Sequence, residues 1–512
     1  MNTLDAEAAG DCPKDSAIED RNASPAEPVM YQVRLLIDAV EADAADAATF
    51  ERRSPISDDV VAVAAAATID DALHAANVAA EAFPGWSEMS PANRRAILMR
   101  AADRLSTRRE DLARAMALET GATRAWADIN IEIASSIIIE SASLTTRIAG
   151  EVVPSSKPGS FAMAFRQPAG VCLGIAPWNA PIILGVRAIA MPLACGNTVL
   201  LKASELCPQT HRLIGDIFLE AGLPPGVLNV ISNAPADAEK IVSALIAHPA
   251  VRRINFTGST RVGRLIAEKA ARHLKRCLLE LGGKAPLIVL DDGDVEEAIR
   301  ATAFGAFMNQ GQICMSTERV ILDERIADRF VSGLLERARG LIAGDTRNSN
   351  FPLGPLISEY SASRLRALIQ DAVSKGAVVL CGGEIRGNFM DATVLDRVTP
   401  AMRIYGEESF GPIVSILRAG SDEEAITIAN ETEYGLSSAI FTANVTRAMK
   451  IARQLESGIC HINGATVADE PQMPFGGLKL SGYGRFGGAA ALDEFTELRW
   501  ITIENGPQTY PI

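Results

Sequence analysis

Short apolar runs alternate with amphipathic segments from residue 170 onward, and this alternation restricts the fold more than any other feature. Five runs have the length and composition of buried strands: 171–176, 198–202, 227–231, 253–257 and 277–281. Four segments between them have helical spacing: 181–193, 208–221, 235–247 and 260–273. Strands that alternate with helices form a parallel sheet with helices on both faces, which predicts an α/β fold with a doubly wound sheet.

A second alternation of the same kind begins near Pro286 and predicts a second α/β domain. Its strands are expected at 287–290, 319–322 and 437–441, and its helices at 295–308, 361–375 and 422–430. Residues 58–120 are rich in alanine with helical spacing, which indicates surface-packed helices. Two segments, 148–168 and 494–512, fit neither sheet and are expected to be extended edge strands that pair with another subunit.

Composition narrows the class of partner and the compartment. The 512 residues include 49 basic and 63 acidic side chains, a balance that disfavours nucleic acid and anionic membranes as partners. No apolar run reaches membrane-spanning length, and residues 1–30 are polar and acidic, typical of a loose tail and not of a signal peptide. The eight cysteines lie far apart without a CxxC pair, and only five histidines are present. We therefore expect a cytoplasmic protein without a metal site.

A cysteine and a glutamate are the strongest candidates for chemistry. Cys314 closely follows the polar, glycine-containing stretch 309–312, and Glu280 lies 34 residues upstream inside an apolar strand. Burial raises the pKa of a carboxyl group, which suits a general base near neutral pH, and a nearby thiol would be the nucleophile. For either residue alone the alternative is structural: a core cysteine or a buried ion pair.

Polar residues also follow the other strands of the first sheet. Asn179 comes after the first strand, Lys202 and Glu205 after the second, and the turn 256–260 after the fourth. The carboxyl ends of parallel strands share one edge, where ligands bind. A glycine-serine turn that leads into a helix suits a phosphate, and a lysine-glutamate pair suits ribose hydroxyls. A plain helix start and surface charges are the alternatives, because the GxGxxG fingerprint is absent after the first strand.

Seven motifs in order resemble the aldehyde dehydrogenase superfamily from about residue 32 to the end. They are 177–179 (PWN), 196–205 (GNT leading to Lys202 and Glu205), 256–260 (FTGST), 279–284 (LELGGK), 310–314 (QGQIC), 408–412 (ESFGP) and 474–477 (PFGG). The resemblance implies that Cys314 attacks an aldehyde to form a thiohemiacetal. It implies that Asn179 and the Cys314 backbone N–H hold the oxyanion. Glu280 would then activate the water that releases the acid from a thioester.

The resemblance also implies a nicotinamide cofactor, with NAD expected and NADP possible. It assigns the cofactor contacts to Ile175, Pro177, Trp178, Lys202, Glu205, Gly258, Ser259, Gly263, Leu281, Glu408 and Phe410. Glu205 near the ribose would repel a 2′-phosphate, whereas Lys202 could meet one. Two departures from the family pattern, Ala203 and the stretch 233–239, lie at the outer end of this site and bear on cofactor preference.

Substrate choice is expected to involve Arg187, Met308 and Met315. Arg187 is the only charge in the helix 181–193, so it needs an acceptor, which either a protein carboxylate or the substrate provides. The two methionines offer adaptable apolar walls or are ordinary packing residues. Residues 313–319 and 461–488 are similar to the salicylaldehyde and vanillin dehydrogenase branch. An aromatic aldehyde is therefore predicted, with the loop 465–473 at the pocket mouth.

The resemblance divides the chain into functional parts. Residues 31–147 and 169–282 would bind the dinucleotide, 283–493 would form the catalytic domain, and 148–168 with 494–512 would build a homodimer or a dimer of dimers. The alternatives are an aliphatic or semialdehyde dehydrogenase, a non-catalytic binding protein on this fold, and a thiol hydrolase. The hydrolase is disfavoured because no histidine lies near Cys314 in the sequence.

Overall fold

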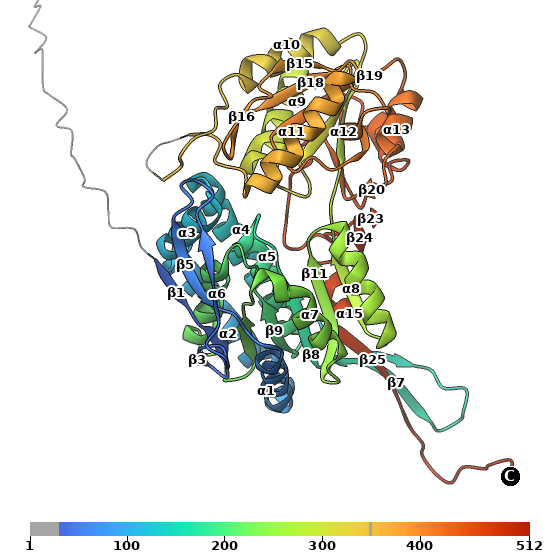
Figure 1. The fold of residues 1–512 in the computed structure, drawn as a ribbon. Helices are drawn as coiled ribbons and strands as arrows, with labels where there is room; N and C mark the ends of the chain where they lie inside the picture. Colours follow the sequence, from blue (N-terminus) through green and yellow to red (C-terminus); the bar gives the residue numbers. More distant parts are fainter. Residues whose placement is uncertain (1–29, 348–350) are drawn as a thin grey trace, which may run out of the picture.

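The computed structural model describes residues 30–347 and 351–512, so the expected N-terminal tail lies, apart from Met30, outside the described residues. Two large sheets with helices on their faces account for most of this part of the chain (Figure 1). Within the described ranges, none of the helices combines the length and the apolarity that crossing a bilayer requires.

The first large sheet has eight strands in the order β24-β12-β11-β8-β9-β10-β2-β3. Its parallel core contains β8 (Val171–Ile175), β9 (Thr198–Lys202), β10 (Leu228–Ile231), β11 (Val251–Thr257) and β12 (Arg276–Glu280). The connecting helices are α5 (Pro181–Ala194), α6 (Pro208–Glu220), η1 with α7 (Pro235–Asp237, Ala238–Ala247) and α8 (Thr260–Arg272). The antiparallel edges are β2 (Leu35–Ile37), β3 (Val40–Ala42) and β24 (Gly482–Tyr483). The predicted alternation is confirmed, because strands buried on both faces show up as continuous apolar runs.

The second large sheet has seven strands in the order β15-β18-β19-β14-β13-β21-β22. The strands are β13 (Ala285–Val289), β14 (Thr317–Asp323), β15 (Val378–Cys381), β18 (Thr393–Asp396), β19 (Ile413–Ala419), β21 (Ser437–Phe441) and β22 (Ile459–Ile462). Its helices are α9 (Val295–Phe307), η2 (Met308–Gly311), α10 (Ala327–Ala338), α11 (Glu359–Ser374), α12 (Arg403–Gly406), α13 (Asp422–Asn430) and α14 (Val445–Ala452). Short ribbons pair β16 (Ile385–Arg386) with β17 (Phe389–Met390) and β20 (Tyr434–Gly435) with β23 (Leu478–Lys479).

The N-terminal region corrects one prediction. Helices α1 (Ile69–Glu88), α2 (Pro91–Thr107) and α3 (Arg109–Thr120) lie in the alanine-rich stretch as expected, and α4 (Arg124–Leu144) follows them. Residues 60–65, which were expected to be helical, form strand β5 (Val60–Ala65) between β1 (Tyr31–Val33) and β4 (Thr49–Arg53). Three β-branched valines in this strand favour extended backbone, and its small side chains fit between two neighbouring strands.

A three-stranded arm extends from the lower sheet in Figure 1. Strand β7 (Phe161–Pro168) pairs with both β6 (Glu151–Val153) and β25 (Thr496–Ile503), and α15 (Ala490–Phe495) leads into β25. The two segments expected to be extended are therefore strands of one sheet. Its apolar side chains are unusually open to solvent, and Trp500 is 78% exposed.

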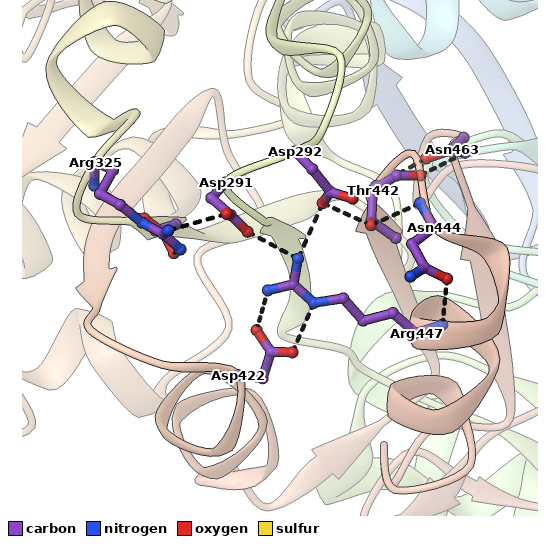
Figure 2. Close-up of polar contacts among 9 residues, drawn as sticks. Asp291, Asp292, Arg325, Asp422, Thr442, Asn444, Arg447 and Asn463 are labelled. Carbon is purple, nitrogen blue, oxygen red and sulfur yellow. Dashed lines mark hydrogen bonds and ion pairs between the residues drawn. The ribbon is translucent and has the colours of Figure 1, made fainter.

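An ion network lies where strands β13 and β21 end, at the carboxyl edge of the second sheet (Figure 2). Arg447 at the start of α14 donates to Asp422 at the start of α13 and, at 2.7 Å and 3.0 Å, to Asp291 and Asp292 after β13. Thr442 donates to Asp292 at 2.7 Å. The network joins three loops at this edge, opposite the edge that carries the site described next.

Candidate active site

The carboxyl ends of β8, β9 and β11 open into a cleft of about 520 Å³, a size typical of ligand pockets. Six of the predicted cofactor residues line this cleft: Ile175, Pro177, Trp178, Lys202, Glu205 and Gly258. The neighbouring walls come from η1, α7 and α8. The cleft lies where the order of the parallel strands reverses, between β8 and β11, which is the usual ligand position in a doubly wound sheet.

A lysine, a glutamate and an asparagine form a polar group at one end of the cleft. Lys202 is buried and pairs with the Glu205 carboxylate, which also accepts a hydrogen bond from Asn233 Nδ2 at 3.1 Å. Asn233 Oδ1 is buried and has no hydrogen-bond partner among the described residues. Ala203 and the stretch 233–239, which depart from the family pattern, therefore lie next to the Lys202–Glu205 pair that lines the cleft.

The glycine-serine turn after β11 connects the cleft to Glu280. Gly258 N–H donates to the backbone oxygen of Glu280 at 3.0 Å. Ser259 caps helix α8 by accepting a 3.4 Å hydrogen bond from Val262 N–H. Gly263 packs against Leu281, because a Cβ there would lie 2.4 Å from the Leu281 side chain. Ser259, Gly263 and Leu281 therefore shape the turn, while Gly258 lines the cavity.

Glu408 and Phe410 reach the same region from the second sheet. Glu408 Oε1 accepts a 2.9 Å hydrogen bond from Gly283 N–H, and a Cβ on Gly282 would lie 2.7 Å from the carboxylate. Phe410 meets Trp178 edge to face, with ring centroids 5.9 Å apart. Burial raises the pKa of Glu408 to about 8, and the Glu318 carboxylate adds to this effect.

A buried ion pair fixes the segment that carries these two residues. Lys284 pairs with Glu318, and the Glu318 carboxylate accepts hydrogen bonds from the backbone N–H groups of Ser409 and Phe410. Sequence reasoning assigned no role to Lys284 or Glu318. Both residues lie within the 279–284 and 313–319 motifs, which indicates that they matter. A motif does not show, however, that the Glu318 side chain binds the backbone N–H groups of Ser409 and Phe410.

The loop before Cys314 has an unusual backbone. Asn309, Gln310 and Gly311 all have positive φ angles, of 50°, 55° and 64°. Such a conformation is costly for the two non-glycine residues and persists only where the surroundings enforce it. Gly311 is required because a Cβ would lie 2.2 Å from the backbone oxygen of Gly411. The turn brings Cys314 to the ends of β12 and β13, where a Cβ on Gly283 would lie 2.2 Å from the Cys314 carbonyl oxygen.

Asn179 is bound to this loop from the β8 side. The side-chain amide of Asn179 donates to the backbone oxygen of Gln312 at 3.0 Å. The backbone oxygen of Asn179 accepts hydrogen bonds from Asn309 Nδ2 at 3.0 Å and Trp126 Nε1 at 2.9 Å. An amide NH₂ has two protons, so one remains for another acceptor. The structure thus brings Asn179 and the Cys314 loop together, as the motifs predicted.

Glu280 and Cys314 lie close enough to perturb one another. Glu280 is 1% exposed, and its carboxylate oxygens have no hydrogen-bond partner among the described residues. Burial raises the pKa of Glu280 to about 7, partly offset by the Cys314 thiol. Burial and then the Glu280 charge raise the pKa of the Cys314 thiol well above its usual range. As a whole residue, Cys314 is partly exposed.

The predicted substrate residues have apolar or paired surroundings. Met315 is buried, and Met308 packs at the border of the same core cluster. Arg187 is buried and pairs with Asp469, and its guanidinium lies 4.4 Å from the centroid of the Phe475 ring. The structure thus gives Arg187 a protein carboxylate. A contact between these three residues and a substrate stays a prediction.

Comparison with known proteins agrees with this geometry. The model for the aldehyde dehydrogenase family matches residues 42–501. The chain belongs to the aldehyde dehydrogenase family. It is thus an aldehyde-oxidising oxidoreductase, and the family's cofactor is NAD(P). The resemblance drawn from the seven motifs is confirmed.

Individual members of the aldehyde dehydrogenase family are similar over nearly the whole chain. Vanillin dehydrogenase from Pseudomonas fluorescens is 56% identical over 483 residues, covering 94% of this chain and 100% of the relative. The crystal structure of salicylaldehyde dehydrogenase from Pseudomonas putida G7, complexed with salicylaldehyde, superposes with a TM-score of 0.93 at 49% identity, covering 94% and 100% of the two chains. The crystal structure of betaine aldehyde dehydrogenase from Staphylococcus aureus in complex with NAD+ superposes with a TM-score of 0.89 at 30% identity. The match covers 93% of this chain and 95% of that chain.

Proposed function

We propose that this aldehyde dehydrogenase oxidises a hydroxylated or methoxylated benzaldehyde, with salicylaldehyde first, to the carboxylic acid and uses NAD. The observation that carries the proposal is the Glu280–Cys314 pair in a chain 49–56% identical to salicylaldehyde and vanillin dehydrogenases. The pair supplies a nucleophile and a base, and the relatives indicate the class of aldehyde.

In the first half-reaction the Cys314 sulfur bonds to the aldehyde carbon, and the thiol proton passes to the adjacent Glu280 carboxylate. The C=O π electrons move to the oxygen, which becomes an oxyanion. The remaining amide proton of Asn179 and the backbone N–H of Cys314 are the donors that would hold this charge. The positive-φ turn at 309–311 precedes the Cys314 N–H, and the hydrogen bond from Asn179 to the Gln312 backbone oxygen holds the second donor against the same loop before a substrate enters.

Between the two half-reactions Glu280 releases the thiol proton to solvent. In the second half-reaction the Glu280 carboxylate accepts a proton from water, and the water oxygen attacks the thioester carbon on Cys314. The C–S bond breaks, the acid leaves, and the sulfur takes the proton from Glu280, which restores the thiol and the carboxylate. Apart from the adjacent Cys314 thiol, the Glu280 carboxylate has no hydrogen-bond partner among the described residues, so it is available to accept this proton.

The residues of the cleft suit a nicotinamide dinucleotide. The Lys202–Glu205 pair lining the cleft offers polar contacts to an adenosine ribose, and the Glu408 carboxylate beside Gly282 offers one to a second ribose. A nicotinamide held there would supply the hydride acceptor that aldehyde oxidation needs. Trp178 and Phe410, which are in edge-to-face contact, are further residues that would hold it.

The Glu205 charge supports NAD over NADP, and a single substitution tests this. Glu205→Gln is expected to lower the ratio of kcat/KM for NAD to that for NADP by roughly tenfold, which corresponds to about 1.4 kcal/mol. The reason is that the carboxylate that repels a 2′-phosphate is gone while Lys202 remains. Steady-state kinetics with both cofactors measures the ratio. Glu239→Gln, at the other wall of the cleft, is the control, and an unchanged ratio for Glu205→Gln would reject the assignment.

An aliphatic semialdehyde is the runner-up substrate. Its acid group would need a free cation, whereas Arg187 is already paired with Asp469. We expect salicylaldehyde, vanillin and benzaldehyde to have kcat/KM values at least tenfold above that of succinic semialdehyde, a difference of about 1.4 kcal/mol or more. Initial rates of NADH formation provide the measurement. An equal or higher value for the semialdehyde would overturn the aromatic proposal.

We also propose the division of labour expected from the motifs, with a dinucleotide-binding part (31–147 and 169–282) and a catalytic part (283–493). The exposed apolar face of the β6–β7–β25 arm supports a homo-oligomer, because a large unpaired apolar patch marks an interaction surface. Trp500 and Leu498 are exposed on one face of the arm, and Val152 is exposed on the other.

A further inference from the structure

A buried ion pair lies beside the candidate catalytic residues and has no role in the steps above. Arg187 on α5 pairs with Asp469 in the loop after β22, and their side chains are 7% and 8% exposed. One carboxylate oxygen of Asp469, Oδ1, is buried without a hydrogen-bond partner among the described residues. Burying two charges costs free energy that their attraction often fails to offset. A pair of this kind next to a catalytic carboxylate therefore calls for an explanation.

One hairpin links this pair to Glu280. Residues 475–486 carry two rings, Phe475 and Phe486, whose centroids lie 4.4 Å and 5.8 Å from the Arg187 guanidinium carbon. The two rings are fixed to each other by reciprocal 2.8 Å backbone hydrogen bonds. Between them, Gly482 pairs with Glu280 across the β24–β12 ladder. The position of the cation and that of the carboxylate are thus set by the same piece of backbone.

The titratable groups that face Glu280 come from three elements. Two of these groups are charged, the Arg187 guanidinium on α5 and the Asp469 carboxylate in the loop 465–473, and the third is the Cys314 thiol. The residues opposite Glu280 on the neighbouring strands are Thr257 on β11 and Gly482 on β24, and both are uncharged. Arg187 favours the ionised form of Glu280 and Asp469 disfavours it. Around a buried carboxylate such as Glu280, the opposing fields of these two charges act strongly.

We propose that Arg187 and Asp469 are positioning residues that set the charge balance around Glu280, with Arg187 favouring the carboxylate that takes a proton from water and Asp469 limiting that effect. The inference rests on the proposed role of Glu280 as the base. It differs from the expectation that Arg187 binds the substrate, because here the guanidinium acts through Glu280.

The two charges predict shifts of opposite sign when they are removed one at a time. Arg187→Met leaves Asp469 as an unopposed anion, so the acidic limb of the kcat profile should move to higher pH by roughly one unit. Asp469→Asn leaves Arg187 unopposed, so the limb should move to lower pH by a similar amount. Arg187→Lys keeps the charge and should stay close to wild type. The double variant Arg187→Met/Asp469→Asn should also lie near wild type.

A second readout keeps the test independent of aldehyde oxidation. The rate at which iodoacetamide alkylates Cys314 in the cofactor-free full chain, followed by peptide mass spectrometry, reports on the same field because Glu280 and Arg187 both act on this thiol. Its pH midpoint should move up in Arg187→Met and down in Asp469→Asn. Shifts in the same direction, or none, in both single variants would overturn the inference even if the enzyme oxidises aromatic aldehydes. If the alkylation midpoint moves in opposite directions in the two single variants but the protein oxidises no aldehyde, the inference about Arg187 and Asp469 holds and the proposed function is rejected.

Discussion

Replacing Cys314 by alanine is expected to lower kcat/KM for aldehyde oxidation by at least about four orders of magnitude while NAD still binds. The sulfur is the atom that bonds to the substrate carbon, and no second thiol lies on the described loop 309–316. The predicted cofactor contacts that line the cleft, in contrast, lie at the ends of β8, β9 and β11, and the thiol is not among the residues that line it. Rates are measured by NADH absorbance, and cofactor binding by titration calorimetry on the same preparation.

Cys381→Ala is the matched control for this variant. Cys381 is also a half-buried thiol, but it lies on β15 at the far edge of the seven-stranded sheet. Its replacement should leave kcat/KM within about twofold of wild type, since it touches neither the cleft nor the Cys314 loop. Oxidation that persists in Cys314→Ala would remove the nucleophile assignment. Loss of activity in both variants would point to a general loss of the fold.

The residues at the strand ends were predictable from the sequence because topology alone brings them together. Strands β8, β9, β11 and β12 are buried on both faces, so they stand out as apolar runs, and the residues after them must meet at one edge. Asn179, Lys202, Glu205 and Gly258 were found in this way. Cys314 follows no strand of the first sheet, so its place beside Glu280 was a hypothesis from residue chemistry, with a structural alternative for each residue, until the family resemblance supported it.

Contacts between segments distant in the sequence were beyond prediction. Asp469 lies 282 positions from Arg187, and Lys284 meets Ser409 across 125 positions. A sequence shows that a buried cation needs an acceptor, yet many carboxylates are available in a chain with 63 of them. Strand β5 was misassigned for a related reason. Its alanines fit helical spacing locally, and only the strands β1 and β4 on either side make it extended.

Glu280→Gln is expected to lower steady-state kcat by two to four orders of magnitude, the usual contribution of a general base. Glutamine keeps the shape of the side chain but accepts no proton from water. Glutamine also takes no proton from the Cys314 thiol, but loss of the Glu280 charge lowers the pKa of that thiol, which can then give its proton to solvent, so acyl formation is expected to suffer less than acid release. Stopped-flow absorbance should therefore show a burst of about one NADH per site, followed by slow turnover. Mass spectrometry of quenched enzyme should find the acyl group on the Cys314 peptide. An unchanged steady-state rate would remove Glu280 from the mechanism.

The same carboxyl group gives activity and stability opposite pH dependences. Activity needs the ionised form, so kcat of the wild type should rise with pH through about 7, the pKa that burial imposes on Glu280. Folding favours the protonated form, because the pKa of Glu280 in the folded chain lies above its ordinary value of 4.5. Stability from this group is therefore full below pH 4.5 and is lost as pH rises to about 7, by on the order of 3 kcal/mol.

Comparing wild type with Glu280→Gln isolates that contribution. Other buried carboxyl groups with raised pKa values, Glu119 and Glu408, titrate in both proteins and cancel in the difference. The variant should gain unfolding free energy relative to wild type as pH rises from 4.5 to 7, while its kcat profile loses the limb near pH 7. Urea unfolding and initial rates across this range measure the two trends. A stability difference that stays constant with pH would mean that Glu280 is ionised in the folded protein well below neutral pH, and the general-base argument would lose its physical basis.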